Sequence, residues 1–410
     1  MLSDLQTVMD NYYELNDPSQ RRNSVDMVVN YLADRKLDDV RGNLDAALGL
    51  LAWCEQETVR WEEGFVEAFV HTVGMMTEDT IHSAAFKQIS PVTRHNLVNA
   101  YNSLQLRVLS AEEQLTNFDF TDMYTNLLGT QSAGHVSKDH PALLAFRNFQ
   151  FFLWQFYQRT YGEWPPPPSS ANRPRGNSGI TQNNPDGRAS WLSRTIALRL
   201  QEDFGAMYDY LVDRNAAWDA DEMRPSRKWQ IVSTKPRSGS FDADVGGFPF
   251  TDMVVSWDLR KDYLHIPHPL PLLPVSRASL HGETGLNGNE KKGAKNKFLG
   301  SFGGFKKGKA VTVKDPKEQF QISLAFNGAT NINRLGTTFE ENTLLDSLSS
   351  FEKSPQNGNL PPGEARLGRW LLLYGILQVL STISVDVSPL RYTQGVSYFL
   401  SPPLTGCPPW

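Results

Sequence analysis

Apolar residues recur at helical spacing over most of the first 161 residues. In the stretch "FVEAFVHTVGMM" the apolar side chains fall on one face of a helix, namely Phe65, Val66, Phe69, Val70 and Val73. Ser90 and Pro91 form a typical helix start, because serine caps free backbone N–H groups and proline fits the first helical position. We expect this helix to continue to about Leu115.

A second long helix is predicted from Pro141 to Gly162, in the sequence "PALLAFRNFQFFLWQFYQRTYG". Its inner stripe is predicted to contain Phe146, Phe149, Leu153 and Phe156. A stripe of this kind indicates core packing rather than a cofactor site. Residues 1–163 are therefore interpreted as an all-helical region.

The composition changes at residues 164–187, "WPPPPSSANRPRGNSGITQNNPDG". Four consecutive prolines and few large apolar side chains predict an exposed linker or long loop. Polyproline ligands of SH3 and WW domains have similar sequences, so that function is an alternative.

Residues 188–410 are expected to combine helices with a smaller β-containing section. Helices are predicted at 188–218, 338–351 and 363–384. Strands are predicted at 228–234, 251–259, 262–266 and 318–326, because these stretches alternate apolar and polar residues or are rich in β-branched and aromatic ones. The predicted fold class is mainly α, of the α+β type, with a disordered Lys/Gly-rich insert at about 275–312.

The helix at 363–384 is apolar on nearly every face, which predicts a position inside the core. Its most apolar part, residues 370–385, includes polar residues such as Gln378 and is shorter than the roughly 20 apolar residues of a membrane span. We therefore expect a buried C-terminal helix rather than a membrane anchor.

Charge is unevenly distributed along the chain. Residues 1–163 contain 12 basic and 22 acidic residues, whereas residues 164–410 contain 28 and 23. The two parts could attract each other or meet different partners. The two cysteines, Cys54 and Cys407, do not form a disulfide framework, and the amino terminus has no secretory signal, so a reduced cytoplasmic compartment is expected.

Two local motifs resemble ligand sites. Gly303, Gly308 and Lys309 match the start of a phosphate-binding loop, but Ala310 replaces the hydroxyl that would bind magnesium. The segment "HIPHP" contains His265 and His268, but its prolines forbid a helix, so we expect a turn with two partly exposed histidines.

The helix around residue 67 carries another candidate cluster. Glu63, Glu67 and His71 are spaced by four and are predicted to share a solvated polar face, because a di-iron site would need Glu-x-x-His pairs. Cys54 with His71 or His82 lacks the local sequence of a catalytic cysteine. The sequence thus predicts no catalytic residue, no metal site and no cofactor.

The strongest functional signal is the stretch "KKGAKNKFLGSFGGFKKGK", residues 291–309. The residues proposed to contact a membrane or another anion are Lys291, Lys292, Lys295, Lys297, Phe298, Phe302, Phe305, Lys306, Lys307 and Lys309. The lysines would attract an anionic lipid surface and the phenylalanines would enter its interface. A passive soluble insert, nucleic acid and an acidic protein partner are the alternatives, although net acidity and the absence of arginine argue against nucleic acid.

The C-terminal part resembles a family of filamentous-fungal proteins of unknown function. The resemblance rests on "RWLLLYGILQ" (369–378), "VSYFL" (396–400) and the closing "PPW". It implies a fungal, intracellular and non-enzymatic protein, and it assigns no role to individual residues.

We therefore expect a cytoplasmic scaffold or interaction protein, peripheral at membranes if the lysine-rich loop binds lipid. The alternative is a hydrolase-like enzyme whose active site is assembled from residues distant in sequence. The sequence identifies neither the protein partner nor the oligomeric state.

Overall fold

The computed structural model describes residues 2–12, 18–127, 139–168, 190–216, 248–263, 266–274, 316–332, 343–354 and 360–410. These ranges contain twelve α-helices, two 3-10 helices and one isolated β-bridge, between Val212 and Pro271. The mainly α class is confirmed. The predicted β-containing section is wrong for the residues described.

Two predicted strands are helices instead. Residues 251–259 lie in α9 (Phe250–Lys261) and residues 318–326 lie in α11 (Pro316–Gly328). In α9 the buried residues Phe250, Met253, Val254 and Trp257 follow the helical spacing i, i+3, i+4, i+7, which outweighs the β propensity of the sequence. The described part of 262–266 contains no strand, and 228–234 lies outside the described residues.

The chain forms two compact units that are interleaved in sequence. The first unit contains residues 1–117, 157–202 and 377–410, and the second contains 118–156 and 203–376. Three helices contribute residues to both units: α7 (Pro141–Tyr161), α8 (Arg194–Leu211) and α13 (Pro362–Ser384).

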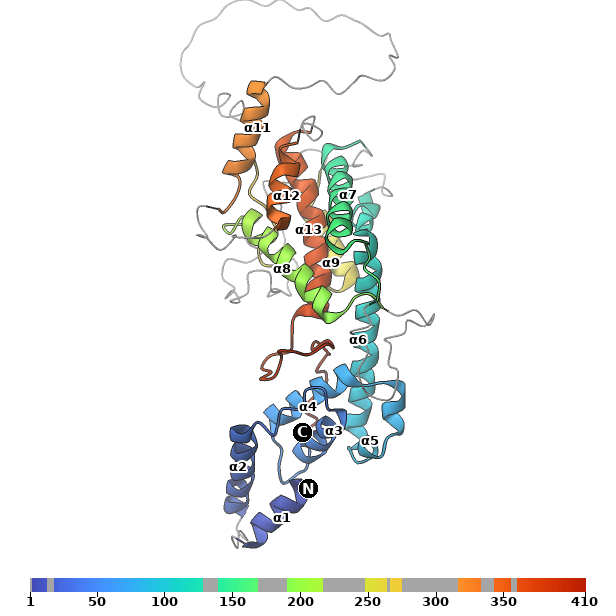
Figure 1. The fold of residues 1–410 in the computed structure, drawn as a ribbon, viewed down its shortest axis with the longest axis vertical. Helices are drawn as coiled ribbons and strands as arrows, with labels where there is room; N and C mark the ends of the chain where they lie inside the picture. The colour runs from blue at the N-terminus through green and yellow to red at the C-terminus, as the bar shows by residue number, and fades with distance from the viewer. Residues whose placement is uncertain are drawn as a thin grey trace, which may run out of the picture. The chain divides into compact units, whose positions relative to one another are not determined.

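The first unit begins with a group of helices that includes α4. Its elements are α1 (Leu2–Tyr12), α2 (Pro18–Arg35), α3 (Leu44–Cys54), α4 (Glu62–Met75), η1 (Glu78–His82), α5 (Ala84–Lys87) and α6 (Pro91–Asn117). Helix α4 packs against α3 and α6 (Figure 1). Ten consecutive residues of α4, from Gly64 to Val73, are buried, so this helix has no solvent-facing side along that length.

The predicted helix start at Ser90 is confirmed. The Ser90 hydroxyl accepts a hydrogen bond from the backbone N–H of Thr93 at 3.3 Å. The Glu55 carboxylate accepts from both the backbone N–H of Ser90 and its hydroxyl, at 2.6 and 2.8 Å. These contacts tie the start of α6 to the end of α3.

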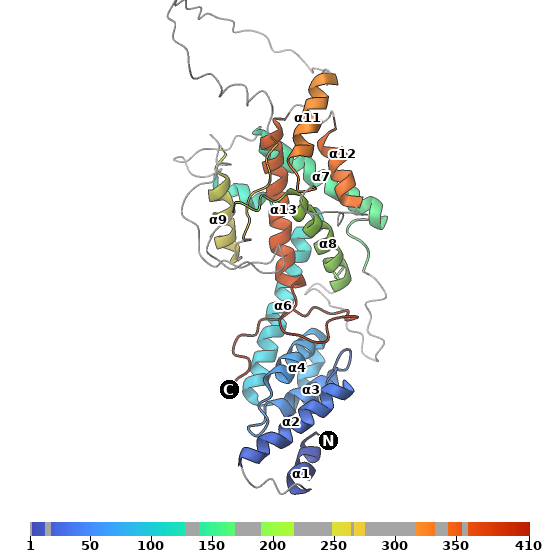
Figure 2. The same cartoon turned by 90° about the vertical axis from the view of Figure 1, so that its left-hand side faces the viewer.

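The first unit is completed by the C-terminal strap, which we define as residues 385–410. The strap contains no helix or strand and lies against α4 (Figures 1 and 2). Leu400 packs on Val66 and Val70 of α4, and Val387, Leu390, Val396, Tyr398 and Leu404 extend that cluster. The contact is close because Gly74 has no side chain: a Cβ there would overlap the ring of Tyr398.

The second unit packs α9, α11, α12 (Thr343–Glu352) and η2 (Thr121–Leu127) with parts of the three shared helices. Trp257 Nε1 donates to Asp122 at 3.1 Å, and the Tyr374 hydroxyl donates to Asp258 at 2.6 Å. Buried aromatic side chains are therefore fixed by their polar atoms as well as by packing.

Helices α13 and α7 approach each other closely. Gly368 of α13 faces the backbone of Ala142 in α7, where a Cβ would overlap the carbonyl group.

The predicted buried C-terminal helix is confirmed as α13. Among the described helices it alone is long and apolar enough to cross a membrane, with a mean hydropathy of 1.3 over its most apolar window. However, 89% of that window is buried inside the protein, as expected of a core helix.

The beginning of the predicted linker is anchored. Trp164 is buried, lies 4.9 Å from the Tyr157 ring by centroid, and donates from Nε1 to the backbone carbonyl of Thr116 at 3.0 Å. Residues 169–189 lie outside the described residues, so the rest of the linker stays a prediction.

Candidate functional site

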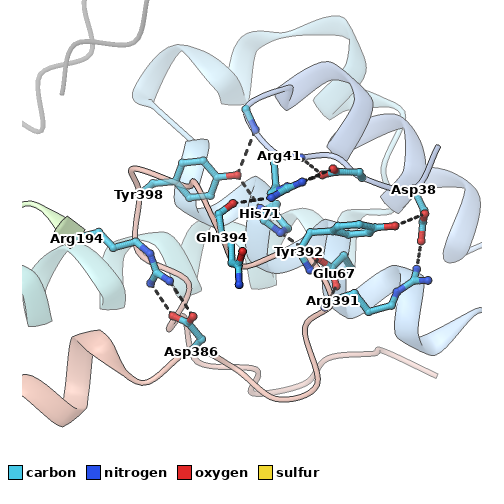
Figure 3. A network of polar contacts seen from close by, with 12 residues as sticks. Asp38, Arg41, Glu67, His71, Arg194, Asp386, Arg391, Tyr392, Gln394 and Tyr398 are labelled. Carbon is cyan, nitrogen blue, oxygen red and sulfur yellow. Dashed lines mark hydrogen bonds and ion pairs between the residues drawn. The ribbon is translucent and has the colours of Figure 1, made fainter. Parts of the chain in front are cut away.

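A network of ionisable and polar side chains lies between α4 and the C-terminal strap (Figure 3). Glu67 and His71 stand one turn apart on α4, and their exposed fractions are 1% and 0%. Buried polar groups are costly unless they form hydrogen bonds, so both residues need partners inside the protein.

His71 is bonded through both ring nitrogens. Its Nε2 lies 3.1 Å from Oε1 of Glu67, and its Nδ1 lies 2.6 Å from the hydroxyl of Tyr398. Because an ionised carboxylate can only accept, the proton belongs on Nε2, and Nδ1 then accepts from the Tyr398 hydroxyl. The tyrosine oxygen in turn accepts from the backbone N–H of Gly42 at 3.3 Å.

Glu67 holds the backbone of the strap. Its Oε2 accepts from the N–H of Arg391 at 2.8 Å, and its Oε1 accepts from the N–H of Tyr392 at 3.1 Å. With the bond from His71, this buried carboxylate accepts three hydrogen bonds. Bonds to a charged group contribute about 1.5–3 kcal/mol each, so Glu67 is a principal anchor of the strap.

Asp38 is a second buried anchor, with an exposed fraction of 1%. Its Oδ1 accepts from the Tyr392 hydroxyl at 2.9 Å, and its Oδ2 forms an ion pair with Arg391. The Arg391 guanidinium also lies over the rings of Trp61 and Tyr392, at 5.8 and 5.4 Å from their centroids. One turn of the strap is therefore fixed by two carboxylates at once.

Arg41 binds the same turn from the solvent side. It forms a bidentate pair with Asp39, at 2.8 and 2.6 Å, and donates to the backbone carbonyl of Gln394 at 2.6 Å. The hydrogen bond from Arg41 lowers the pKa of Asp39, and the same bond raises the pKa of Arg41. The pair thus stays charged and keeps Arg41 oriented towards the strap.

Further contacts fix the two ends of the strap. Near its start, Arg194 forms a bidentate pair with Asp386 at 2.6 and 2.8 Å. Arg107 donates to the backbone carbonyl of Ser401 at 2.6 Å, and Asn96 donates to that of Gly406 at 2.8 Å. The last residue, Trp410, lies edge-on to Phe65 with ring centroids 5.1 Å apart.

The chemistry of this group is that of a closed hydrogen-bonded chain. Carboxylate, imidazole and phenol stand in the order of a proton relay, but both nitrogens of His71 are occupied by the protein itself. Burial raises the pKa of Tyr398 to about 12, so the phenol stays protonated at neutral pH. The arrangement therefore suits holding the strap rather than activating a substrate.

The structure corrects two sequence predictions about histidines and carboxylates. Glu67 and His71 were predicted on a solvated polar face with Glu63, but only Glu63 is exposed, because the strap covers the other two. His268 was predicted to be partly exposed, but it is buried, with Nδ1 at 3.2 Å from the carbonyl of Ala216. His265 lies outside the described residues.

The predicted membrane or anion contact, from Lys291 to Lys309, lies outside the described residues. It therefore stays a prediction. Within the described residues, no group of three or more histidine, cysteine, aspartate or glutamate side chains could hold a metal ion.

Sequence reasoning missed Glu67, His71 and Asp38 as a set with Tyr392 and Tyr398. One signal was available, since Glu67 and His71 stand among consecutive apolar residues of α4. The sequence could not identify the strap as the partner of these residues, because Tyr398 is 327 positions from His71.

Comparison with known proteins gives one finding. A model of a domain of unknown function (DUF8004) matches residues 25–120. The match covers α3, α4 and α6, with Asp38, Glu67 and His71, and ends well before the strap. No curated protein and no solved structure matches the chain.

Proposed function

We propose that this chain is a binding protein of the scaffold type without a catalytic centre. The observation that carries the proposal is that Glu67 and His71 are closed to solvent. Each is at most 1% exposed and forms hydrogen bonds with the strap. An enzyme needs converging ionisable groups that a substrate can reach. Here the converging groups are used to hold one part of the chain on another.

We further propose that residues 291–309 contact anionic membrane surfaces. The support is compositional: seven lysines and no acidic residue, with Phe298, Phe302 and Phe305 between them. Each basic residue near an anionic surface contributes about 1 kcal/mol, so the segment could supply several. On this proposal the protein is cytoplasmic and peripheral at membranes.

Flotation with lipid vesicles tests the membrane proposal. The protein should float with vesicles that contain phosphatidylserine and not with neutral vesicles, and added salt should release it because screening is strong above about 0.1 M. Lys306→Gln with Lys307→Gln should weaken flotation. Lys36→Gln with Lys87→Gln, two exposed lysines elsewhere, removes the same charge and should leave it unchanged.

Two results would contradict this proposal. One is equal flotation of both double variants, which would indicate a general charge effect. The other is equally salt-sensitive binding to single-stranded oligonucleotides, which would favour a nucleic-acid partner. Replacing Phe298, Phe302 and Phe305 by alanine should weaken flotation further if these rings enter the interface.

A hydrolase-like enzyme is the second candidate function. One observation favours it: residues 327 positions apart do assemble into a Glu67–His71–Tyr398 chain. A screen of ester, phosphoester and glycoside substrates tests it with wild type and His71→Gln. Turnover that disappears in a folded His71→Gln variant would establish the enzyme, and no turnover with any substrate class would favour binding.

The C-terminal motifs support a proposal about origin. On "RWLLLYGILQ", "VSYFL" and "PPW" we propose that the chain belongs to the filamentous-fungal family that it resembles. The described cysteines are both free, which suits a reduced compartment. Localisation of a tagged chain in fungal cells, in the cytoplasm or elsewhere, tests this part.

A further inference from the structure

Two buried arginines of the second unit share a single carboxylate. Arg366 and Arg369 lie in α13 and are 0% and 2% exposed, and Glu352 at the end of α12 is 5% exposed. Among the described residues, these two positive charges are therefore paired with one negative charge. Such an excess is costly in a protein interior, and arginine does not lose its proton there.

Arg366 is almost completely satisfied. Its Nε and Nη2 donate to the two oxygens of Glu352 at 2.9 and 3.0 Å, which is a bidentate pair along one edge of the guanidinium. Its Nη1 donates to the backbone carbonyls of Leu272 and Ala329 at 3.1 and 2.8 Å. Arg366 and Glu352 therefore neutralise each other.

Arg369 is not satisfied. Its Nη1 donates to Glu352 at 3.1 Å, but its Nε is buried and has no hydrogen-bond partner in the part of the chain that the structure describes. The edge that carries Nε and Nη2 is the same edge through which Arg366 holds its carboxylate. In Arg369 the buried Nε of that edge meets no acceptor among the described residues.

Aromatic rings line the Arg369 guanidinium. Its carbon lies 5.6 Å from the centroid of Phe326 and 5.2 Å from that of Phe351. Burial lowers the pKa of Arg369, and the charge of Glu352 only partly opposes this shift. The surroundings therefore disfavour the charged form of Arg369. Rings of this kind partly compensate a cation but cannot accept the in-plane hydrogen bonds of Nε and Nη2.

We propose that the Nε and Nη2 edge of Arg369 binds an oxyanion, either a phosphate group or a carboxylate. Both groups match a guanidinium edge with two parallel hydrogen bonds, as the Arg366–Glu352 pair already does in the same cluster. A water molecule could accept one hydrogen bond but would leave the excess charge in place. The ligand would complete a cluster of two arginines and two anions.

Titration calorimetry and native mass spectrometry of the full-length chain test the site, with inorganic phosphate in one arm and acetate in the other. Chloride at equal ionic strength is the reference. Because Arg369 is 2% exposed, entry needs local opening, so samples are equilibrated for a long time before measurement. We expect saturable binding of one anion, and the arm that binds more tightly identifies the group.

Variants connect the binding to Arg369. Arg369→Gln should abolish it, and Arg369→Lys, which keeps the charge but loses the planar edge, should weaken it roughly tenfold. Arg199→Gln removes a half-exposed arginine of a surface pair and should bind as wild type does. Glu352→Gln should bind the anion more tightly, because the competing carboxylate is lost.

The wild-type titration alone can overturn the proposal, even if Arg369→Gln does not fold. Absence of saturable binding by either anion would mean that water or the chain itself satisfies Arg369. Equal binding by wild type and a folded Arg369→Gln variant would place the anion elsewhere and equally overturn the assignment.

Discussion

Glu67 is a principal anchor of the strap. It accepts from His71 and from two backbone N–H groups of the strap, and an amide side chain cannot accept at both of its ends. Glu67→Gln should therefore lower the free energy of unfolding by about 1–3 kcal/mol.

Chemical denaturation of the two purified proteins measures this difference. Glu63→Gln is the matched control, since Glu63 lies one turn earlier on α4 and is exposed. Its stability should stay within about 0.5 kcal/mol of wild type. Equal stability of the two variants would show that Glu67 does not anchor the strap.

Tyr398 should make stability depend on pH in the alkaline range. Burial raises its pKa to about 12, above the ordinary value of about 10. The folded state then holds this proton more tightly than the unfolded state. The resulting stabilisation is complete below pH of about 10 and is lost as pH rises towards about 12.

Melting temperatures measured from neutral to alkaline pH in wild type and Tyr398→Phe check this window. The variant should be less stable at neutral pH, and its melting temperature should decline less steeply above pH of about 10. Tyr12→Phe, a change at a side chain that is 84% exposed, serves as the control. Parallel curves for wild type and Tyr398→Phe would disprove the role of this phenol.

At the scale of single residues, the sequence predicted the burial of apolar side chains correctly but not the burial of polar ones. The apolar residues around Phe65 are buried as expected. Glu67 and His71 were assigned to solvent because α4 was assumed to have an outer face. That face is covered by a segment more than 300 positions away, and no local pattern encodes such a partner.

At the scale of elements, glycine positions distinguish points of close helix approach from points with open space. Gly368 in α13 lies where a Cβ would overlap the Ala142 carbonyl of α7, whereas Gly49 in α3 has nothing within 4 Å. Alanine favours helix over glycine by about 1 kcal/mol. Gly49→Ala should thus stabilise by up to about 1 kcal/mol, and Gly368→Ala should destabilise by about 1–3 kcal/mol through overpacking.

Thermal and chemical unfolding of both variants measure whether the free energy of unfolding rises or falls relative to wild type. The pair is internally controlled, because the chemical change and the helical context are the same. If Gly368→Ala were as stable as Gly49→Ala, the close approach of α7 and α13 would be wrong.

Element boundaries were predicted well where caps and long periodic patterns agreed. The helices from Pro91 and Pro141 begin as expected, and Gly162 follows the end of α7 with a φ of 80°. Helix α11 was missed although Pro316 at its first position and Gly328 at its last are helix signals. Its alternating "EQFQISLAF" pattern was given more weight, and a short stretch of that kind does not decide between helix and strand.

At the scale of the whole molecule, the matched domain depends on residues outside it. Residues 25–120 contain Asp38, Glu67 and His71, and the partners of all three include strap residues. Deletion of residues 386–410 should expose these groups together with Val66 and Val70. We expect α4 to lose protection from amide hydrogen exchange, while α9 in the second unit keeps its protection.

Hydrogen exchange followed by mass spectrometry checks this in the truncated chain. A synthetic peptide of residues 386–410, added in excess, should restore protection of α4. A peptide with Tyr392 and Tyr398 replaced by phenylalanine should restore it poorly, since it lacks the hydroxyls that bind Asp38 and His71. Unchanged protection of α4 after truncation would show that the helices fold without the strap.

The long sequence separation between α4 and the strap also sets an order of events during synthesis. A ribosome adds about 5–20 residues per second. The 327 positions between His71 and Tyr398 therefore take roughly 15–65 s to make. For that interval Glu67 and His71 of α4 have been synthesised without their partners in the strap, so the part of the fold around α4 is completed only after the strap has been made.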